Sequence, residues 1–119
     1  FIDGITYGAG FEIALASDYI YATSQSSFAL PEIKLGYIPA AGGSQLIIRK
    51  LPLSDAKRIV YTGEPTTTDR LHELGLINRI IERKNFNNEI DILCKQLLNY
   101  DTKELRKLKS KFVNFVNTH

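Results

Sequence analysis

The sequence predicts an α/β or α+β fold, on the basis of three observations. Short runs of aromatic and β-branched residues, typical of strands, occur mainly in the first part of the chain. Stretches with apolar residues at helical spacing follow, and the longest of them lie near the C-terminus. Turns rich in glycine and proline separate these segments, without internal repeats or low-complexity linkers. We therefore expect a partial sheet with helices around it.

The first half of the chain is predicted to alternate turns with short regular elements. Gly8, Ala9 and Gly10 carry little side chain, so the backbone here can approach a ligand closely. Good helix formers follow, so this turn leads into a helix N-terminus with free N–H groups. In order, we expect a glycine turn at 4–10, a helix at 11–17, strands at 19–23 and 28–30, and a loop at 36–43.

The second half is predicted to be mainly helical. Ser54 is expected to be the N-cap of a helix that Gly63 terminates. Asp101 and Glu104 have the spacing of a capping box, with Asp in place of Ser or Thr. In order, we expect helices at 44–50, 54–62, 67–74, 86–99 and 101–116, with a β-branched strand at 76–81.

Composition is that of an ordinary globular chain, because 44% of its 119 residues are hydrophobic and 24% are charged. No apolar run is long enough for a membrane span, and no signal-peptide pattern is present, so we expect a cytoplasmic protein without a membrane partner. One cysteine and two separated histidines argue against a metal site. The chain opens at Phe1 and contains no methionine, so we expect a piece of a longer protein.

Charge divides the chain at residue 82. The net charge of +2 is the sum of −2 over residues 1–82 and +4 over residues 83–119. We expect a core fragment at 1–82 and a truncated helical region at 83–119. A basic region can bind nucleic acid or an acidic partner. Apolar residues interrupt the basic ones here, however, so a solvated helix face is favoured over a nucleic-acid partner.

Two glutamates lie among apolar neighbours. Glu12 follows the glycine turn in the first helical turn, and Glu32 follows a strand and a proline. A carboxyl group in apolar surroundings is harder to ionise, which suits a glutamate for proton transfer near neutral pH. Two structural interpretations remain open: Glu12 can favour the positive end of the helix dipole, and Glu32 can pair with Lys34 or Arg49 on the surface.

Three linked segments resemble the enoyl-CoA hydratase/isomerase (crotonase) superfamily. They are GITYGAGFEIALASD at 4–18, FALPEIKLG at 28–36 and YIPAAGGSQ at 37–45, in the order and at the gaps of the family's glycine-rich, Pro-Glu and Pro-Gly-Gly blocks. The likeness extends from Phe1 to about Ile81 and is weaker beyond. It implies the C-terminal portion of an α/β crotonase-like (ClpP/crotonase) spiral fold, with a partial sheet surrounded by helices.

The resemblance also implies catalytic roles. The family holds an acyl-CoA thioester and stabilises an enolate with two backbone N–H groups, of which Ala9 would supply one by motif position. Glu12 and Glu32 match the two acid/base positions of hydratases, which add water to a 2-enoyl-CoA. In that scheme Glu12 is the base toward water and Glu32 protonates the carbon next to the thioester. Relatives that shift double bonds generally keep only the acid at the position of Glu32, so the pair favours a hydratase.

Five further positions are implied in substrate binding: Gly8, Gly10, Tyr37, Pro39 and Ala40. Ala40 stands where hydratases usually carry a glycine whose N–H helps to place the catalytic water. The family needs no cofactor, because the acyl-CoA thioester is the substrate. The complete protein is expected to form a homo-oligomer, a trimer or a dimer of trimers.

The region that precedes Phe1 in the family carries the other oxyanion donor and much of the CoA site. We therefore expect this chain to be inactive alone. Two alternatives stay open. One is an isomerase or another acyl-CoA-processing relative, which the alanine at position 40 favours. The other is a non-catalytic binding or assembly module that acts through the basic region at 83–119.

Overall fold

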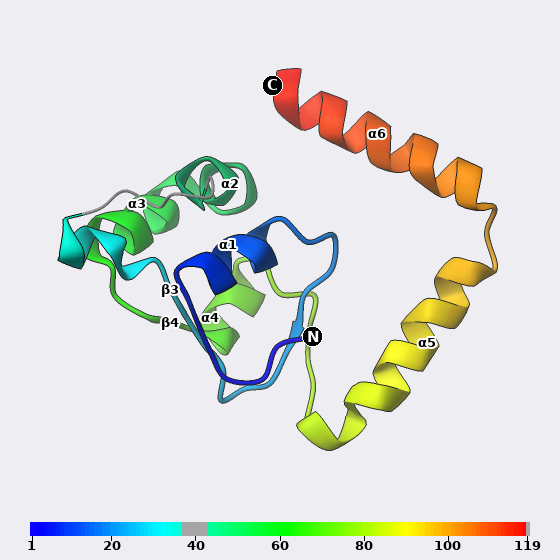
Figure 1. The fold of residues 1–119 in the computed structure, drawn as a ribbon, viewed down its shortest axis with the longest axis horizontal. Helices are drawn as coiled ribbons and strands as arrows, with labels where there is room; N and C mark the ends of the chain where they lie inside the picture. Colours follow the sequence, from blue (N-terminus) through cyan, green and yellow to red (C-terminus); the bar gives the residue numbers. More distant parts are fainter. Residues whose placement is uncertain (37–42, 119) are drawn as a thin grey trace. The chain divides into compact units, whose positions relative to one another are not determined.

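The computed structural model describes residues 1–36 and 43–118, and the chain divides into two compact units, Phe1–Arg83 and Lys84–His119. The first unit contains β1 (Ile5–Tyr7), α1 (Ala9–Leu15), β2 (Tyr21–Ala22), β3 (Ser27–Ala29), the 3-10 helix η1 (Pro31–Leu35), α2 (Gly43–Lys50), α3 (Leu53–Thr62), β4 (Thr66–Thr67), α4 (Thr68–Glu73) and β5 (Arg79–Ile80) (Figure 1). The 3-10 helix η2 (Arg83–Asn85) then leads to α5 (Phe86–Leu98) and α6 (Thr102–Thr118).

Two small sheets organise the first unit. In the three-stranded sheet the order is β1-β3-β4, with β1 parallel and β4 antiparallel to β3. Phe28 of β3 is paired with Thr6 on one side and Thr66 on the other. In the second sheet β2 and β5 are parallel, with Ala22 opposite Ile80. This mixture of strands and covering helices is the α/β architecture that the sequence predicts.

The glycine turn expected at 4–10 is partly wrong, because β1 lies inside it. Ile5–Tyr7 is extended and pairs with Ser27–Ala29, and only afterwards does the chain turn at Gly8. Pro31 was expected only to end a strand, yet it opens η1. The fixed φ of proline suits the first position of a helix, where a missing N–H costs nothing.

Two helix starts also differ from expectation. The helix expected to begin after Ser54 begins at Leu53, since Ala56 N donates to Pro52 O (3.0 Å) and Pro52 is the N-cap. The helix expected at 67–74 begins at Thr68, because Thr67 belongs to β4 and caps the helix by accepting a hydrogen bond from Arg70 N (3.1 Å). Helix termination at Gly63 is confirmed, with the left-handed conformation that glycine favours.

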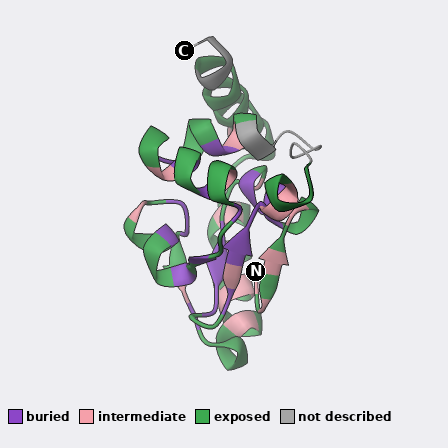
Figure 2. Ribbon diagram, turned by 90° about the vertical axis from the view of Figure 1, so that its left-hand side faces the viewer, coloured by how far each residue is buried: buried purple, intermediate pink, exposed green. Residues whose placement is uncertain are grey.

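The hydrophobic core of the first unit lies between α1, β3 and the helices that cover them (Figure 2). The rings of Phe11 and Phe28 are in contact at its centre, with 5.4 Å between their centroids. Burial of such side chains is the main stabilising contribution in a domain of this size. The largest fully buried apolar residues are Phe11, Leu15, Phe28, Leu30, Ile47, Ile59, Leu71 and Ile77.

Buried polar groups hold the loops around this core. The Thr68 hydroxyl lies 2.7 Å from Thr23 O and 3.0 Å from Ser26 O, while the Ser26 hydroxyl accepts a hydrogen bond from Gly4 N (2.9 Å). Ile20 and Asn78 are joined by two hydrogen bonds of 2.8 Å. Ile20 N donates to Asn78 Oδ1, and Asn78 N donates to Ile20 O. These bonds fix turns that have no regular secondary structure.

The second unit consists of α5 and α6. At the start of α6 the Asp101 carboxylate accepts a hydrogen bond from Lys103 N (2.7 Å), which caps the helix. Cys94 is exposed. Among the described residues, no helix is long and apolar enough to cross a membrane.

Candidate active site

The candidate site is built around the turn at Gly8, between β1 and α1. The Gly8 N–H donates to Ala29 O (2.9 Å), and Gly8 O accepts from Glu12 N (3.0 Å). Gly8 therefore joins the end of β3 to the first turn of α1. Its φ of 58° lies in the left-handed region, which residues with a Cβ adopt only at an energetic cost.

Glu12 is the buried acid of this site. It lies in the first turn of α1 and is only 4% exposed. Its Oε2 atom is buried and has no hydrogen-bond partner among the described residues. Phe11 and Leu15 on the same helix are fully buried, so Glu12 belongs to the buried face of α1.

Glu32 reaches the same turn from a later segment of the chain. It is the second residue of η1, which follows directly after β3. Its Oε2 atom is also buried without a partner among the described residues, and its Oε1 atom lies 2.9 Å from the position that a Cβ on Gly8 would occupy. The backbone conformation favours glycine at position 8, and a Cβ there would oblige the Glu32 carboxyl group to shift.

Two buried carboxyl oxygens without a partner among the described residues are unusual for a purely structural arrangement. Buried polar atoms nearly always find a partner, and those that do not are concentrated at functional sites. The surface pairing of Glu32 with Lys34 is not what the structure shows, because Lys34 Nζ lies 2.8 Å from Glu64 Oε1 instead. Glu32 Oε1 lies against the Gly8 turn, and Glu12 is in the first turn of the helix that follows it.

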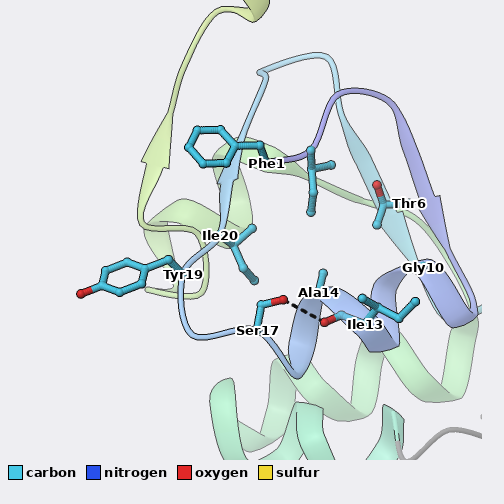
Figure 3. Close-up of a pocket in the computed structure, with 9 residues that line it drawn as sticks. Phe1, Thr6, Gly10, Ile13, Ala14, Ser17, Tyr19 and Ile20 are labelled. Atoms are coloured by element: carbon cyan, nitrogen blue, oxygen red, sulfur yellow. Dashed lines mark hydrogen bonds between the residues drawn. The ribbon is translucent and has the colours of Figure 1, made fainter. Parts of the chain in front are cut away.

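Ala9 and Gly10 follow Gly8 at the start of α1. Ala9 is the first residue of the helix, so its N–H has no intrahelical acceptor. Gly10 lines a hollow of about 180 Å³ on α1, together with Thr6, Ile13 and other residues (Figure 3). Neither glutamate lines this hollow.

The remaining predicted positions, Tyr37, Pro39 and Ala40, lie outside the described residues. Within residues 1–36 and 43–118, no group of three or more His, Cys, Asp or Glu side chains could hold a metal ion. Sequence reasoning missed the packing of Gly63 against η1: a Cβ there would lie 3.1 Å from Ile33 Cγ2 and 3.2 Å from Pro31 Cα. Gly63 was predicted as the end of a helix, and this glycine was the available signal.

Comparison with solved structures defines the fold. The chain superimposes on enoyl-CoA hydratase subunit I from Geobacillus kaustophilus HTA426 with a TM-score of 0.90 and 31% identity, covering 96% of this chain and 44% of that one. A carnitinyl-CoA dehydratase from Mycobacterium avium 104 gives a TM-score of 0.84 and 35% identity, over 89% of this chain and 41% of that one. The fold is therefore a partial crotonase-like α/β fold, as the resemblance implied.

Sequence comparison gives the family. All of residues 1–119 match the family model for enoyl-CoA hydratase/isomerase. Carnitinyl-CoA dehydratase from Salmonella agona (strain SL483) is 35% identical over 98 residues, which are 82% of this chain and 38% of that protein. The chain belongs to the enoyl-CoA hydratase/isomerase family, and it spans less than half the length of these relatives.

Proposed function

We propose that this chain carries the acid/base pair of a hydratase that adds water to 2-enoyl-CoA thioesters. The observation that carries the proposal is that Oε2 of Glu12 and Oε2 of Glu32 are both buried without a hydrogen-bond partner among the described residues, while Glu32 Oε1 approaches Gly8, the turn from which the helix of Glu12 begins. Groups that transfer protons need to be shielded from bulk water and free of competing partners. Membership of an enzyme family whose relatives are hydratases and dehydratases supports this assignment.

The proposed reaction divides the work between the two carboxyl groups. Glu12 accepts a proton from water as the water oxygen bonds to C3 of the enoyl group. The electron pair of the C2–C3 double bond moves toward the thioester carbonyl, whose oxygen accepts a hydrogen bond from Ala9 N–H. Glu32 then gives a proton to C2, so the product is the 3-hydroxyacyl-CoA. Loss of one oxyanion donor in such a site costs about 3–4 kcal/mol of transition-state stabilisation.

The test uses a chimera in which residues 1–119 replace the matching segment of the Geobacillus kaustophilus hydratase subunit. We expect the chimera to hydrate crotonyl-CoA, measured by the loss of absorbance of the conjugated thioester. Glu12→Gln and Glu32→Gln should each lower kcat by at least a hundredfold, because general acid–base catalysis contributes about 10²–10⁴-fold. Glu73→Gln, at an exposed position on α4, is the matched control. Activity unchanged by either active-site substitution would overturn the assignment.

The carnitinyl-CoA dehydratases among the relatives favour one extension of the assay. Hydration and dehydration are the two directions of one reaction, so the same acid and base serve both. Carnitinyl-CoA is therefore the second substrate to test, in the direction of water loss. An isomerase predicts instead that a 3-enoyl-CoA is converted to the 2-enoyl-CoA and that Glu12→Gln has no effect.

We also propose that the complete protein assembles into a homo-oligomer. Leu108, Phe112 and Phe115 lie along one stripe of α6 and are each more than half exposed. Apolar residues at this spacing are typical of a helix face that packs against another surface. Light scattering should report a trimer or a larger multiple, and Phe112→Glu should lower the measured mass. A monomeric wild-type protein would contradict this part of the proposal.

A further inference from the structure

The helix that carries Glu32 has few contacts of its own. η1 is a single 3-10 turn of five residues, and none of its residues is fully buried. Its hydrogen-bond geometry is less favourable than that of an α-helix, so a helix of this kind depends on what packs against it. Two described elements hold it: β3, from which it emerges, and the end of α3, on which it rests.

The contact with α3 is concentrated at Gly63. A Cβ at this position would lie 3.1 Å from Ile33 Cγ2, 3.2 Å from Pro31 Cα and 3.3 Å from Lys34 Cγ. The residues on both sides of Glu32 thus lie against the bare Cα of Gly63. Because Pro31 Cα belongs to the backbone, a side chain at position 63 cannot be accommodated by a rotamer change alone.

A second contact reinforces the first. The next residue, Glu64, forms an ion pair of 2.8 Å with Lys34. Both side chains are about half exposed, so this pair contributes little to stability but favours one orientation of η1. The turn at Gly63 and Glu64 therefore contacts η1 at Pro31, Ile33 and Lys34, while Gly8 leaves room for the Glu32 carboxyl group.

We infer that Gly63 is a positioning residue for Glu32. By allowing η1 to rest directly on the end of α3, it sets the position of the Glu32 carboxyl group against the Gly8 turn. The inference rests on the proposed function for its catalytic meaning. Its structural content, the link from Gly63 through η1 to Gly8, can be measured without any assay of activity.

Gly75 provides a matched control. Like Gly63 it follows a helix in the left-handed conformation, with φ of 85° against 64°, but a Cβ added at Gly75 meets nothing within 4 Å. Alanine at either position has to adopt a positive φ, so both substitutions carry the same kind of backbone strain. Only at Gly63 does the added methyl group press on η1. A difference between the two variants therefore reports the contact and not the strain.

The experiment is nuclear magnetic resonance on the labelled 119-residue chain. In the wild type we expect cross-relaxation between the Gly8 α-protons and the Glu32 side chain, and between the rings of Phe11 and Phe28. In Gly63→Ala the first signal should fall at least twofold while the core signal persists. In Gly75→Ala both should persist. If Gly63→Ala does not fold, Gly63→Asn takes its place beside Gly75→Asn, because asparagine adopts positive φ more readily.

The outcomes separate the two proposals. A Gly8–Glu32 signal that is unchanged in Gly63→Ala, or that falls equally in Gly75→Ala, overturns the positioning role whatever the activity is. In the hydratase chimera, Gly63→Ala should lower kcat by ten- to a hundredfold relative to Gly75→Ala with little change in KM, because small displacements of a reacting group have effects of this size. An inactive parent chimera counts against the proposed function alone.

Discussion

Replacing Glu12 by methionine should stabilise the chain while removing the proposed base. Glu12 is 4% exposed, and its Oε2 atom is buried without a partner in the part of the chain that the structure describes. An unsatisfied buried polar atom costs about 1–3 kcal/mol, and a carboxylate near a helix N-terminus recovers about 0.3–1 kcal/mol of this. Methionine has a similar length and helix propensity, so it fills the same space. The free energy of unfolding should rise by about 1–2 kcal/mol.

The assay is urea unfolding followed by circular dichroism, with thermal melts as a second measure. Each added kcal/mol in the free energy of unfolding should raise the Tm by roughly 4–8 °C in a unit of about 80 residues. Glu73→Met is the control, because Glu73 is two-thirds exposed and only pairs with Arg70 at the surface. That substitution should change the free energy of unfolding by no more than about 1 kcal/mol, and downward. Glu12→Met that destabilises the chain as much as Glu73→Met does would refute the reasoning.

Three further predictions concern the core, a buried hydroxyl and a surface amine. Phe28→Ala removes a fully buried ring in contact with Phe11 and should lower the free energy of unfolding by about 3–5 kcal/mol, as urea titration would show. Thr68→Val keeps the shape but removes the one hydroxyl hydrogen available to the buried Thr23 O and Ser26 O, so it should cost about 1–3 kcal/mol in the same titration. Partial burial lowers the pKa of Lys50 from 10.5, against a raising contribution from Asp18. The penalty for its charge is therefore fully present below the lowered pKa and disappears as pH rises toward 10.5. The free energy of unfolding of the wild type, minus that of Lys50→Met, should rise over that pH interval. A difference that does not change with pH would contradict this.

The sequence predicted the helical elements well, because each signal for them is local. Gly63 ends α3 as expected, since only a residue free to adopt positive φ continues the chain there. The strands were harder to predict. β1 was missed because Gly4 and Gly8 suggested a turn, whereas Ile5–Tyr7 is extended only through its pairing with a strand about twenty residues away. Such pairings depend on contacts that no short window contains.

The candidate site was predicted in its residues but not in its geometry. The family likeness selected Glu12, Glu32 and Gly8, and the structure brings Glu32 Oε1 against Gly8. The packing of Gly63 could not be read from spacing, because it joins residues thirty positions apart through bare backbone. Ser54 was misplaced as a cap because the carbonyl of Pro52 accepts the first hydrogen bond of the helix, which places the N-cap two residues earlier than the pattern suggests.

The two hydrogen bonds between Ile20 and Asn78 affect how quickly the chain can reach its native state. They close a loop of nearly sixty residues, and the parallel pairing of β2 with β5 spans the same separation. The entropy of closing such a loop is lost before any contact across it is gained. We therefore expect these bonds to form late, after the helices inside the loop have condensed. Asn78→Ala should speed unfolding far more than it slows refolding.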